Sequence, residues 1–365
     1  MSRVLVLGGM TRTLTMFRMP MLRAMVAAGH DVIAAAPDEA PEVPPALESI
    51  GVRWQPIEFE RNRVQPLRDL RFVSRIRRLI RDVEPDRLLT YTIKPNIYGG
   101  WAARAEGVPS AAMVTGLGTV FMTPGLRRGV ATVMLRHACR HHDRVFLQNR
   151  EDRDDLLHAG VLEDDAKVVM TAGSGVDLDH FPARPRPDAP VFLMLARLLE
   201  AKGVREYLEA ARRVRAACPD AVVRLAGMED PGSGGVPMRE IEAAVTRGDL
   251  EYLGHLADVR DALASCSVFV LPSWYEGTPH SVLEAMATGR AIVTTDARGC
   301  RETVLPGENG LLVPVRSAEA LADAMLELAG DPGRRASMGD RSRRIAEERF
   351  DGDRVAATIL EALAL

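Results

Sequence analysis

The stretch Val268-Phe-Val-Leu-Pro-Ser-Trp-Tyr-Glu-Gly-Thr-Pro-His-Ser-Val-Leu-Glu-Ala-Met-Ala-Thr-Gly289 decides the fold class. It begins with an apolar run typical of a buried strand, passes through a turn rich in Gly and Pro, and continues as a helical pattern. A second apolar run, Ala291 to Thr294, follows directly. This order predicts a crossover unit of a parallel sheet, because parallel neighbouring strands need a long connection and a helix supplies it.

The same alternation of short apolar runs and helical patterns extends in both directions. Continuous apolar runs are typical of strands that helices cover on both faces of a parallel sheet. Four prolines between Phe181 and Pro190 interrupt the series and predict a stiff linker between two doubly wound α/β domains. We expect strands at 4–7, 31–35, 52–59, 87–91, 110–115 and 144–148 before the linker, and at 191–196, 221–226, 250–253, 268–271, 291–294 and 311–313 after it.

Length and composition fit two domains and exclude several classes. A chain of 365 residues, 47% hydrophobic and 27% charged, is too long for one ordinary core and unlike disordered, collagenous or coiled-coil chains. A net charge of −3 argues against nucleic acid as the partner. The four cysteines form no CxxC pair, so they indicate neither a zinc cluster nor a disulfide framework, and we expect a reducing compartment.

The charges are unevenly distributed, and the basic part contains an amphipathic helix. Between Arg53 and Arg150 the chain has 18 Lys and Arg against 8 Asp and Glu. One helical face should pack on the sheet through Leu67, Leu70, Val73, Ile76, Leu79, Ile80 and Val83. Another face presents four arginines that either contact anionic lipid or are simply solvated: Arg68, Arg71, Arg75 and Arg78.

Two carboxylates lie beside a potential anion site in the opening stretch. Glu276 is in the turn and Glu284 is in the first turns of the helix, so both are expected to face one pocket. The N–H groups of residues 280–282 begin that helix without intrahelical partners, and the helix dipole favours a phosphate there. Carboxylates beside such a site suit a ligand with sugar hydroxyls, which donate hydrogen bonds. A helix cap with a surface glutamate is the alternative interpretation.

Arg197 and Lys202 form a second candidate group, in Leu195-Ala-Arg-Leu-Leu-Glu-Ala-Lys-Gly203. Arg197 ends the first strand of the second domain and Lys202 begins the next helix. An arginine fork and a mobile lysine charge together can neutralise a diphosphate as it becomes a leaving group. Alone, an arginine at a strand end is more often an ordinary salt-bridge partner.

Two other patterns have weaker interpretations. The glycine-rich residues 227–235 follow a strand, but they lack the Lys-Ser/Thr of a P-loop, and we interpret them as a loop at the edge of a cleft. The sequence His141-His142-Asp143 predicts a charged surface cluster rather than a metal site, because adjacent side chains diverge.

The segments 276–289 (EGTPHSVLEAMATG) and 196–203 (ARLLEAKG), with the Gly-Gly turn after the first strand, resemble the retaining glycosyltransferases of family 4. The resemblance spans nearly the whole chain and implies the GT-B fold, two Rossmann-like domains facing an interdomain cleft, with no metal cofactor. It implies an acceptor domain at 1–183, a nucleotide-sugar donor domain at 184–348 and a helix at 349–365 that crosses back to the first domain.

The resemblance also implies roles for individual residues. Glu284 would hold the ribose hydroxyls, Glu276 a hydroxyl of the transferred sugar, and Arg197 and Lys202 the diphosphate. The last three residues are therefore the expected catalytic groups. The remaining donor contacts implied are Gly8, Gly9, Leu253, Gly254, His255, Gly277, Thr278, His280, Ser281 and Val282.

A narrower resemblance is to a bacterial branch that builds surface polysaccharides or glycans on a polyprenyl diphosphate. It rests on segments 91–99 (YTIKPNIYG), 116–121 (GLGTVF), 146–149 (FLQN), 173–181 (GSGVDLDHF) and 294–304 (TTDARGCRETV). It implies a UDP-linked donor of N-acetylhexosamine type, a lipid-linked saccharide acceptor and a peripheral position at the cytoplasmic face of the inner membrane. The acceptor contacts expected are Tyr91, Thr92, Lys94, Asn96, Gly116 and Gly118.

Two positions depart from the family pattern. Many members have a histidine at the first-domain strand end where this chain reads Thr90-Tyr-Thr-Ile-Lys94, and no His lies between Asp31 and Arg136. A His general base is therefore excluded there, which favours a mechanism in which the donor's leaving phosphate takes the acceptor proton. His280 stands where the narrower branch often has Arg.

Two other functions remain open at the level of sequence. A nucleotide-sugar epimerase or hydrolase on the same scaffold would need dedicated acid and base groups, and the strand end without histidine argues against it. The other is a nucleotide-sugar-binding subunit without activity, although Glu276, Glu284, Arg197 and Lys202 are all present.

Overall fold

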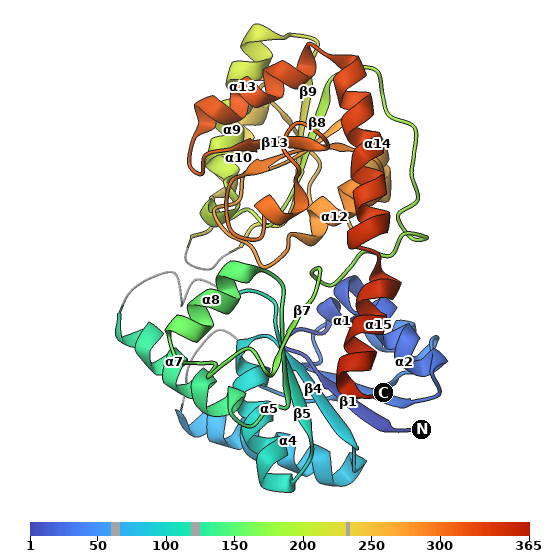
Figure 1. Cartoon of the computed structure of the whole chain (residues 1–365). Coiled ribbons are helices and arrows are strands. Elements are labelled where there is room, and N and C mark those ends of the chain that lie inside the picture. The colour runs from blue at the N-terminus through green and yellow to red at the C-terminus, as the bar shows by residue number, and fades with distance from the viewer. Residues whose placement is uncertain (60–65, 118–124, 231–233) are drawn as a thin grey trace. The chain divides into compact units, whose positions relative to one another are not determined.

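The chain folds into two compact units (Figure 1), in a computed structural model that describes residues 1–59, 66–117, 125–230 and 234–365. The first unit comprises Met1–Gly175 and Gly352–Leu365, and the second comprises Val176–Asp351. Each unit contains a parallel sheet with helices packed on it, so the predicted α/β class is confirmed.

The sheet of the first unit has the strand order β3-β2-β1-β4-β5-β6-β7. In the middle of it, Leu5 pairs with Ile33 on one side and Leu88 on the other, in parallel register. The elements of this unit are β1 (Arg3–Leu7), α1 (Arg12–Phe17), α2 (Met19–Ala27), β2 (Asp31–Ala36), α3 (Val43–Glu48), β3 (Arg53–Pro56), α4 (Pro66–Val83), β4 (Arg87–Tyr91), α5 (Ile93–Glu106), β5 (Ser110–Val114), α7 (Leu126–Cys139), β6 (Arg144–Leu147), α8 (Arg150–His158), β7 (Val168–Met170) and, from the end of the chain, α15 (Gly352–Leu363).

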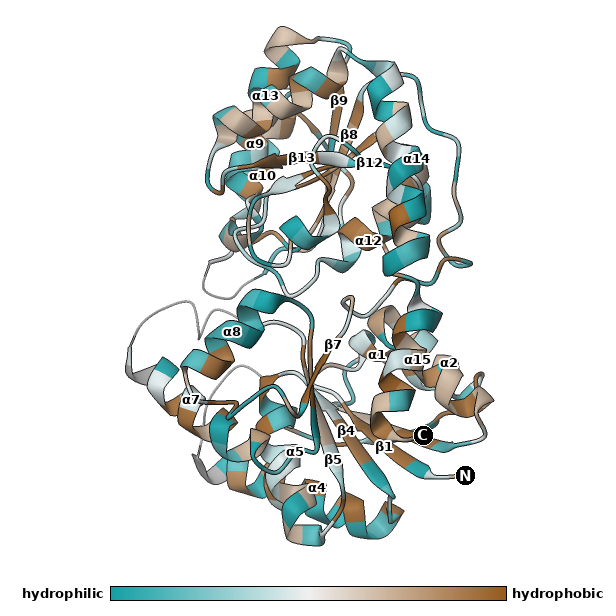
Figure 2. Ribbon diagram, viewed as in Figure 1, coloured by the Kyte–Doolittle hydropathy of each residue, from teal (hydrophilic) through white to brown (hydrophobic). Residues whose placement is uncertain are grey.

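Apolar clusters lie on both faces of this sheet, because successive side chains of a strand point to opposite faces. Leu5 and Leu7 of β1 pack with α4, α5 and α7, whereas Val4 and Val6 pack with α1, α2 and α15. The inner strands are correspondingly largely hydrophobic (Figure 2), whereas the edge strand β3 is mostly exposed. Helix α15, at the end of the chain, thus completes the core of the first unit. Its Ile359 side chain is only 1% exposed and packs in this core.

The sheet of the second unit has the order β10-β9-β8-β11-β12-β13. Helix α9 packs against α13, and α12 packs against α14. The elements are β8 (Val191–Leu195), η1 (Glu200–Lys202), α9 (Val204–Ala217), β9 (Val222–Ala226), α10 (Met238–Thr246), β10 (Glu251–Tyr252), α11 (Arg260–Ala264), β11 (Val268–Leu271), α12 (His280–Ala287), β12 (Ala291–Thr295), η2 (Arg301–Thr303), β13 (Gly310–Val313), α13 (Ala318–Ala329) and α14 (Pro332–Arg349).

The proline-rich segment 181–190 is not a free linker. Arginines of the second unit donate hydrogen bonds to its carbonyls: Arg343 to Phe181, Arg290 to Arg184, and Arg335 to Asp188. The guanidinium of Arg290 is fully buried and also donates to Cys266. A segment rich in proline cannot form a regular backbone ladder, so its carbonyls need hydrogen-bond donors from elsewhere. The arginines of the second unit supply these donors, and the segment therefore belongs to that unit.

Helix α4 confirms the predicted helix but differs in its packed face. Leu70, expected to face the sheet, is 63% exposed, whereas Phe72, outside the predicted stripe, is 1% exposed. Asp69 occupies the neighbouring buried position because it forms an ion pair with Lys94 of α5 at 2.9 Å. The predicted positions Ile76, Leu79 and Ile80 are buried, so the difference concerns the part of the helix around Leu70.

The surface cluster expected at 141–143 is also wrong in part. His142 is fully buried, its Nε2 lies 2.9 Å from the carbonyl oxygen of Asn96, and its Nδ1 lies 2.9 Å from Oγ of Ser110. The carbonyl can only accept, so Nε2 carries the proton of a neutral imidazole. Burial lowers the pKa of His142 to about 4.

Candidate functional site

The strand order of each sheet reverses at one place, between β1 and β4 in the first unit and between β8 and β11 in the second. Doubly wound sheets bind ligands at the carboxyl ends of the strands beside such a reversal. The predicted site residues lie there: Gly8 follows β1, Tyr91 ends β4, Arg197 follows β8 and Glu276 follows β11.

Lys202 and Glu276 come together at the reversal in the second unit. Nζ of Lys202 donates to Oε1 of Glu276, and Oγ of Ser273 donates to the same oxygen at 2.7 Å. The Lys202 and Glu276 side chains are 23% and 13% exposed, so the pair is largely enclosed yet open to a ligand. Ser273 was not predicted, and its position three residues before Glu276 in the turn is the signal that could have indicated it.

The turns that hold this pair require glycine at two places. Gly203 has a φ of +73°, and a Cβ there would lie 2.1 Å from the carbonyl oxygen of Pro272. A Cβ on Gly299 would lie 2.4 Å from the carbonyl oxygens of Glu276 and Gly277. The N–H of Glu276 donates to the carbonyl of Arg298 at 2.9 Å. Backbone contacts this close fix the Glu276 turn, because a larger residue could not be accommodated.

Arg197 is paired with a carboxylate that sequence reasoning missed. Its Nη1 lies 2.8 Å from Oδ2 of Asp230, and the two side chains are 52% and 24% exposed. Asp230 lies in the glycine-rich segment after β9, the neighbour of β8. An acidic residue in a loop at the carboxyl edge of an adjacent strand is the sequence signal for it.

Helix α12 places the second predicted carboxylate. Oε1 of Glu284 lies 2.9 Å from Nδ1 of His280, one turn earlier, and both side chains are nearly enclosed. The N–H of Val282 already donates to Pro279 at 3.0 Å, which removes it from the predicted set of open donors. Thr278 and Ser281 lie in this turn and helix, while Leu253, Gly254 and an exposed His255 follow β10.

In the first unit, the Gly-Gly turn packs on the end of β4. A Cβ on Gly8 would lie 2.2 Å from the hydroxyl of Tyr91, and one on Gly9 would lie 2.2 Å from Oγ1 of Thr92. Thr92 has a φ of +71°, a conformation that costs a non-glycine residue of order 1–3 kcal/mol. The glycines are therefore needed for the close approach of two turns, in addition to any ligand contact.

A buried arginine supports the same turns. Arg18 is 3% exposed, lies 4.8 Å from the ring centroid of Tyr91 and donates to Oγ of Ser174 at 2.7 Å. The Tyr91 hydroxyl lies 3.1 Å from Oγ1 of Thr13, and burial raises the pKa of Tyr91 to about 12. Arg18 thus connects the end of β4 with the segment that leaves the first unit.

Most of the predicted acceptor residues are less available than expected. Asn96 is 1% exposed, its Oδ1 accepts from Thr90 and its Nδ2 donates to the carbonyl of Met113, so this side chain is a structural group. Tyr91 is buried as described, and Lys94 is paired with Asp69. Thr92 and Gly116 remain at turns, and Gly118 lies outside the described residues.

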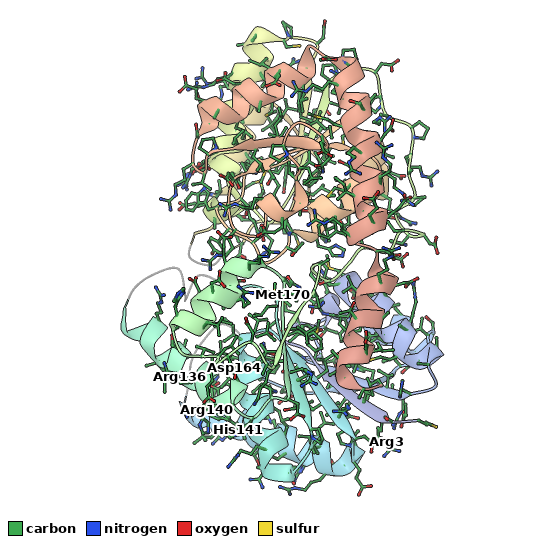
Figure 3. All side chains as sticks on the ribbon, in the orientation of Figure 1. Arg3, Arg136, Arg140, His141, Asp164 and Met170 are labelled. Carbon is green, nitrogen blue, oxygen red and sulfur yellow. The ribbon has the colours of Figure 1, made fainter. Side chains whose placement is uncertain are left out.

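The arginines of the basic face of α4, at positions 68, 71, 75 and 78, are all exposed. Arg75 also contacts Glu58 at 3.2 Å. Arg136 lies in the last turn of α7, and Arg140 and His141 follow the helix (Figure 3). Across the described ranges, none of the helices is both long and apolar enough to cross a membrane. Nor do these ranges contain a cluster of three His, Cys, Asp or Glu side chains suited to a metal ion.

Family models match both units. Residues 8–172 match the glycosyl transferase 4-like domain, and residues 189–331 match the glycosyl transferases group 1. The first range begins directly after β1 and contains the strands β2 to β7, and the second contains β8 to β13.

Curated relatives match over most of their length. One is the N,N'-diacetylbacillosaminyl-diphospho-undecaprenol alpha-1,3-N-acetylgalactosaminyltransferase of Campylobacter jejuni, 27% identical over 335 residues, or 86% of each chain. Another is the UDP-Gal:alpha-D-GlcNAc-diphosphoundecaprenol alpha-1,3-galactosyltransferase of Escherichia coli, 25% identical over 73% of this chain and 72% of that protein. Among solved structures, HepE of Anabaena in complex with UDP-glucose superposes over 100% of both chains with a TM-score of 0.81 and 19% identity.

Proposed function

The chain belongs to the glycosyltransferases that these two family models describe, and from this premise we propose that it transfers a sugar from a UDP-sugar to a saccharide carried on a polyprenyl diphosphate. The sugar is of N-acetylhexosamine type, and the new bond retains the donor's anomeric configuration. No metal ion takes part. The two relatives named for transfer to undecaprenol-linked saccharides support the acceptor class.

The second unit binds the donor. Arg197 and Lys202 hold the diphosphate, Glu276 accepts a hydrogen bond from the sugar, and Glu284 accepts from the ribose hydroxyls. The observation that most supports this assignment is the contact of Lys202 with Glu276 at the strand reversal, since a cation and a carboxylate lie side by side where such sheets bind ligands. Fixed charges of this kind stabilise the leaving diphosphate without a reorganisation cost.

The first unit binds the lipid-linked acceptor near the turns at Gly8 and Thr92, and the arginines of α4 contact anionic lipid. With no histidine at the end of β4, the leaving phosphate itself takes the acceptor proton, and the protein positions the groups. In this proposal the enzyme acts at the cytoplasmic face of the inner membrane.

Transfer assays test the proposal. The protein is incubated with polyprenyl diphosphate-linked GlcNAc and, in separate reactions, UDP-GalNAc, UDP-GlcNAc, UDP-galactose, UDP-glucose and GDP-mannose. We expect transfer from a UDP-sugar, an α-linked product by NMR and no loss of rate in EDTA. Glu276→Gln and Lys202→Met should each reduce turnover by about 100-fold or more, the scale at which lost transition-state charge stabilisation acts.

The control is Glu240→Gln, which breaks an ion pair with Arg205 at 2.9 Å in the same unit but outside the site. Unchanged turnover in both site variants would overturn the assignment of the site. Donor consumption at the full rate without acceptor would instead favour the epimerase or hydrolase alternative.

A further inference from the structure

The glycine-rich segment after β9 is fixed along the residues that carry Arg197. The N–H of Leu198 donates to the carbonyl of Met228 at 2.9 Å, and the carbonyl of Leu198 accepts from Val236 at 2.8 Å. The N–H of Glu200 donates to Gly234 at 2.8 Å. Both described arms of the segment are therefore joined by backbone hydrogen bonds to the residues next to Arg197.

A close backbone approach sets the position of Asp230 within this arrangement. A Cβ on Gly227 would lie 1.7 Å from the carbonyl oxygen of Ala196, so this position requires glycine. From there the chain reaches Asp230, whose Oδ2 accepts from Nη1 of Arg197 at 2.8 Å. The carboxylate is held against the guanidinium by its own loop.

A carboxylate and a phosphate group offer an arginine the same acceptor geometry, two oxygens in a plane facing the fork of N–H donors. Arg197 therefore cannot give its full set of donors to a diphosphate while Asp230 occupies part of it. Asp230 also repels an incoming diphosphate, because both are negative. Glu276, the partner of Lys202, has a sugar to bind in the proposed function, whereas Asp230 has no assigned ligand.

We propose that Asp230 is an internal competitor of the donor's diphosphate for Arg197, which weakens the binding of nucleoside diphosphate and promotes its release after transfer. The inference rests on the proposed function, because it takes the diphosphate to bind at Arg197 and Lys202. Release of the product limits the turnover of many enzymes, and a carboxylate that recaptures the arginine favours that step.

Calorimetric titration with UDP tests the proposal on the full-length protein. Asp230→Asn keeps the shape of the side chain and removes its charge, so the Kd for UDP should fall about threefold to tenfold and UDP should dissociate more slowly. The matched control is Asp340→Asn, which breaks another Arg–Asp pair of 2.8 Å in the same unit, with Arg186, and should leave the Kd unchanged. An unchanged or higher Kd for Asp230→Asn would overturn the proposal.

A double-mutant cycle separates competition from simple repulsion. In an Arg197→Met background, Asp230→Asn should no longer tighten UDP binding, since the contested donor is absent. An equal gain in that background means that Asp230 acts by charge repulsion alone, and contradicts competition. If wild-type protein does not bind UDP, or if Lys202→Met leaves UDP binding unchanged, the proposed function itself fails. If wild-type protein binds UDP and Asp230→Asn has no effect, only this inference is rejected.

Discussion

At the scale of single residues, the proposed donor site consists of polar side chains that already contact one another. Lys202 contacts Glu276, Arg197 contacts Asp230, and His280 contacts Glu284. In the proposed function, a nucleotide-sugar replaces these partners with its own oxygens and hydroxyls, so its affinity is a difference between two sets of hydrogen bonds. The low exposure of the Glu276 side chain keeps this exchange partly shielded from water, which strengthens it.

The sequence predicted these residues through their position after strands, but it did not predict their partners. Glu276, Lys202 and Arg197 could be predicted because each follows an apolar run that ends at the ligand edge of a sheet. Asp230 could not, because its contact with Arg197 depends on how two loops 33 residues apart meet in space. Asn96 was predicted to contact the acceptor because the local sequence pattern does not reveal its buried hydrogen bond to the carbonyl of Met113.

His142 makes a prediction about acid stability. Burial holds its pKa at about 4 in the fold, whereas an unfolded histidine titrates near 6.5. Between about pH 6.5 and pH 4 the imidazole of His142 is protonated in the unfolded chain but neutral in the folded chain. The free energy of unfolding therefore falls as the pH drops towards 4. Between pH 7 and pH 5 this residue should cost about 2 kcal/mol of unfolding free energy, measured by urea denaturation.

The variant His142→Gln removes that titration, so the loss of stability between pH 7 and pH 5 should be smaller by about the same amount. His158→Gln, which changes an exposed histidine on α8, is the control and should retain the wild-type pH dependence. An identical pH dependence in wild type and His142→Gln would contradict the role of burial at this position.

At the scale of elements, α4 illustrates how far a helical pattern reaches. The periodicity predicted the helix and its arginine face, because both depend on spacing along one element. It did not predict which side is buried near Leu70, because Asp69 occupies the packed position through a partner on α5. The prediction of a linker at residues 181–190 was wrong for a similar reason. The arginines that bind this segment lie about a hundred or more positions later in the chain.

The exposed face of α4 makes a prediction about membranes. Leu70 is exposed on the same helix as Arg71 and Arg78, a combination suited to the headgroup region of an anionic bilayer. Since each cation near such a surface contributes about 1 kcal/mol, Arg71→Glu with Arg78→Glu should reduce binding to phosphatidylglycerol vesicles by about tenfold or more in co-sedimentation. Added salt should weaken wild-type binding as well.

The matched control for α4 is the same double charge reversal on exposed arginines of the second unit, Arg239→Glu with Arg344→Glu. It should leave vesicle binding largely unchanged. Equal binding of wild type to neutral phosphatidylcholine vesicles would exclude electrostatic attraction as the cause.

At the scale of the whole molecule, the first unit is built from two separate parts of the chain. The first unit takes its last helix from the end of the chain, after the second unit has been completed. Val355, Ile359 and Leu363 of α15 are buried with residues of β1, β2 and α2. Part of the core of the first unit therefore forms only when residues 352–365 are present, although nearly all of its sequence precedes Val176.

This arrangement predicts that a mutation near the end of the chain destabilises the first unit selectively. Ile359→Ala removes a side chain that is 1% exposed, and such truncations cost about 2–4 kcal/mol. Hydrogen exchange followed by mass spectrometry should show faster exchange in β1, β2 and α2, with β8, β11 and β12 unaffected. Ile292→Ala, which truncates a fully buried side chain of β12, should give the opposite pattern. If both variants accelerate exchange equally in both sheets, the units unfold as one cooperative structure, and α15 then stabilises the second unit as much as the first.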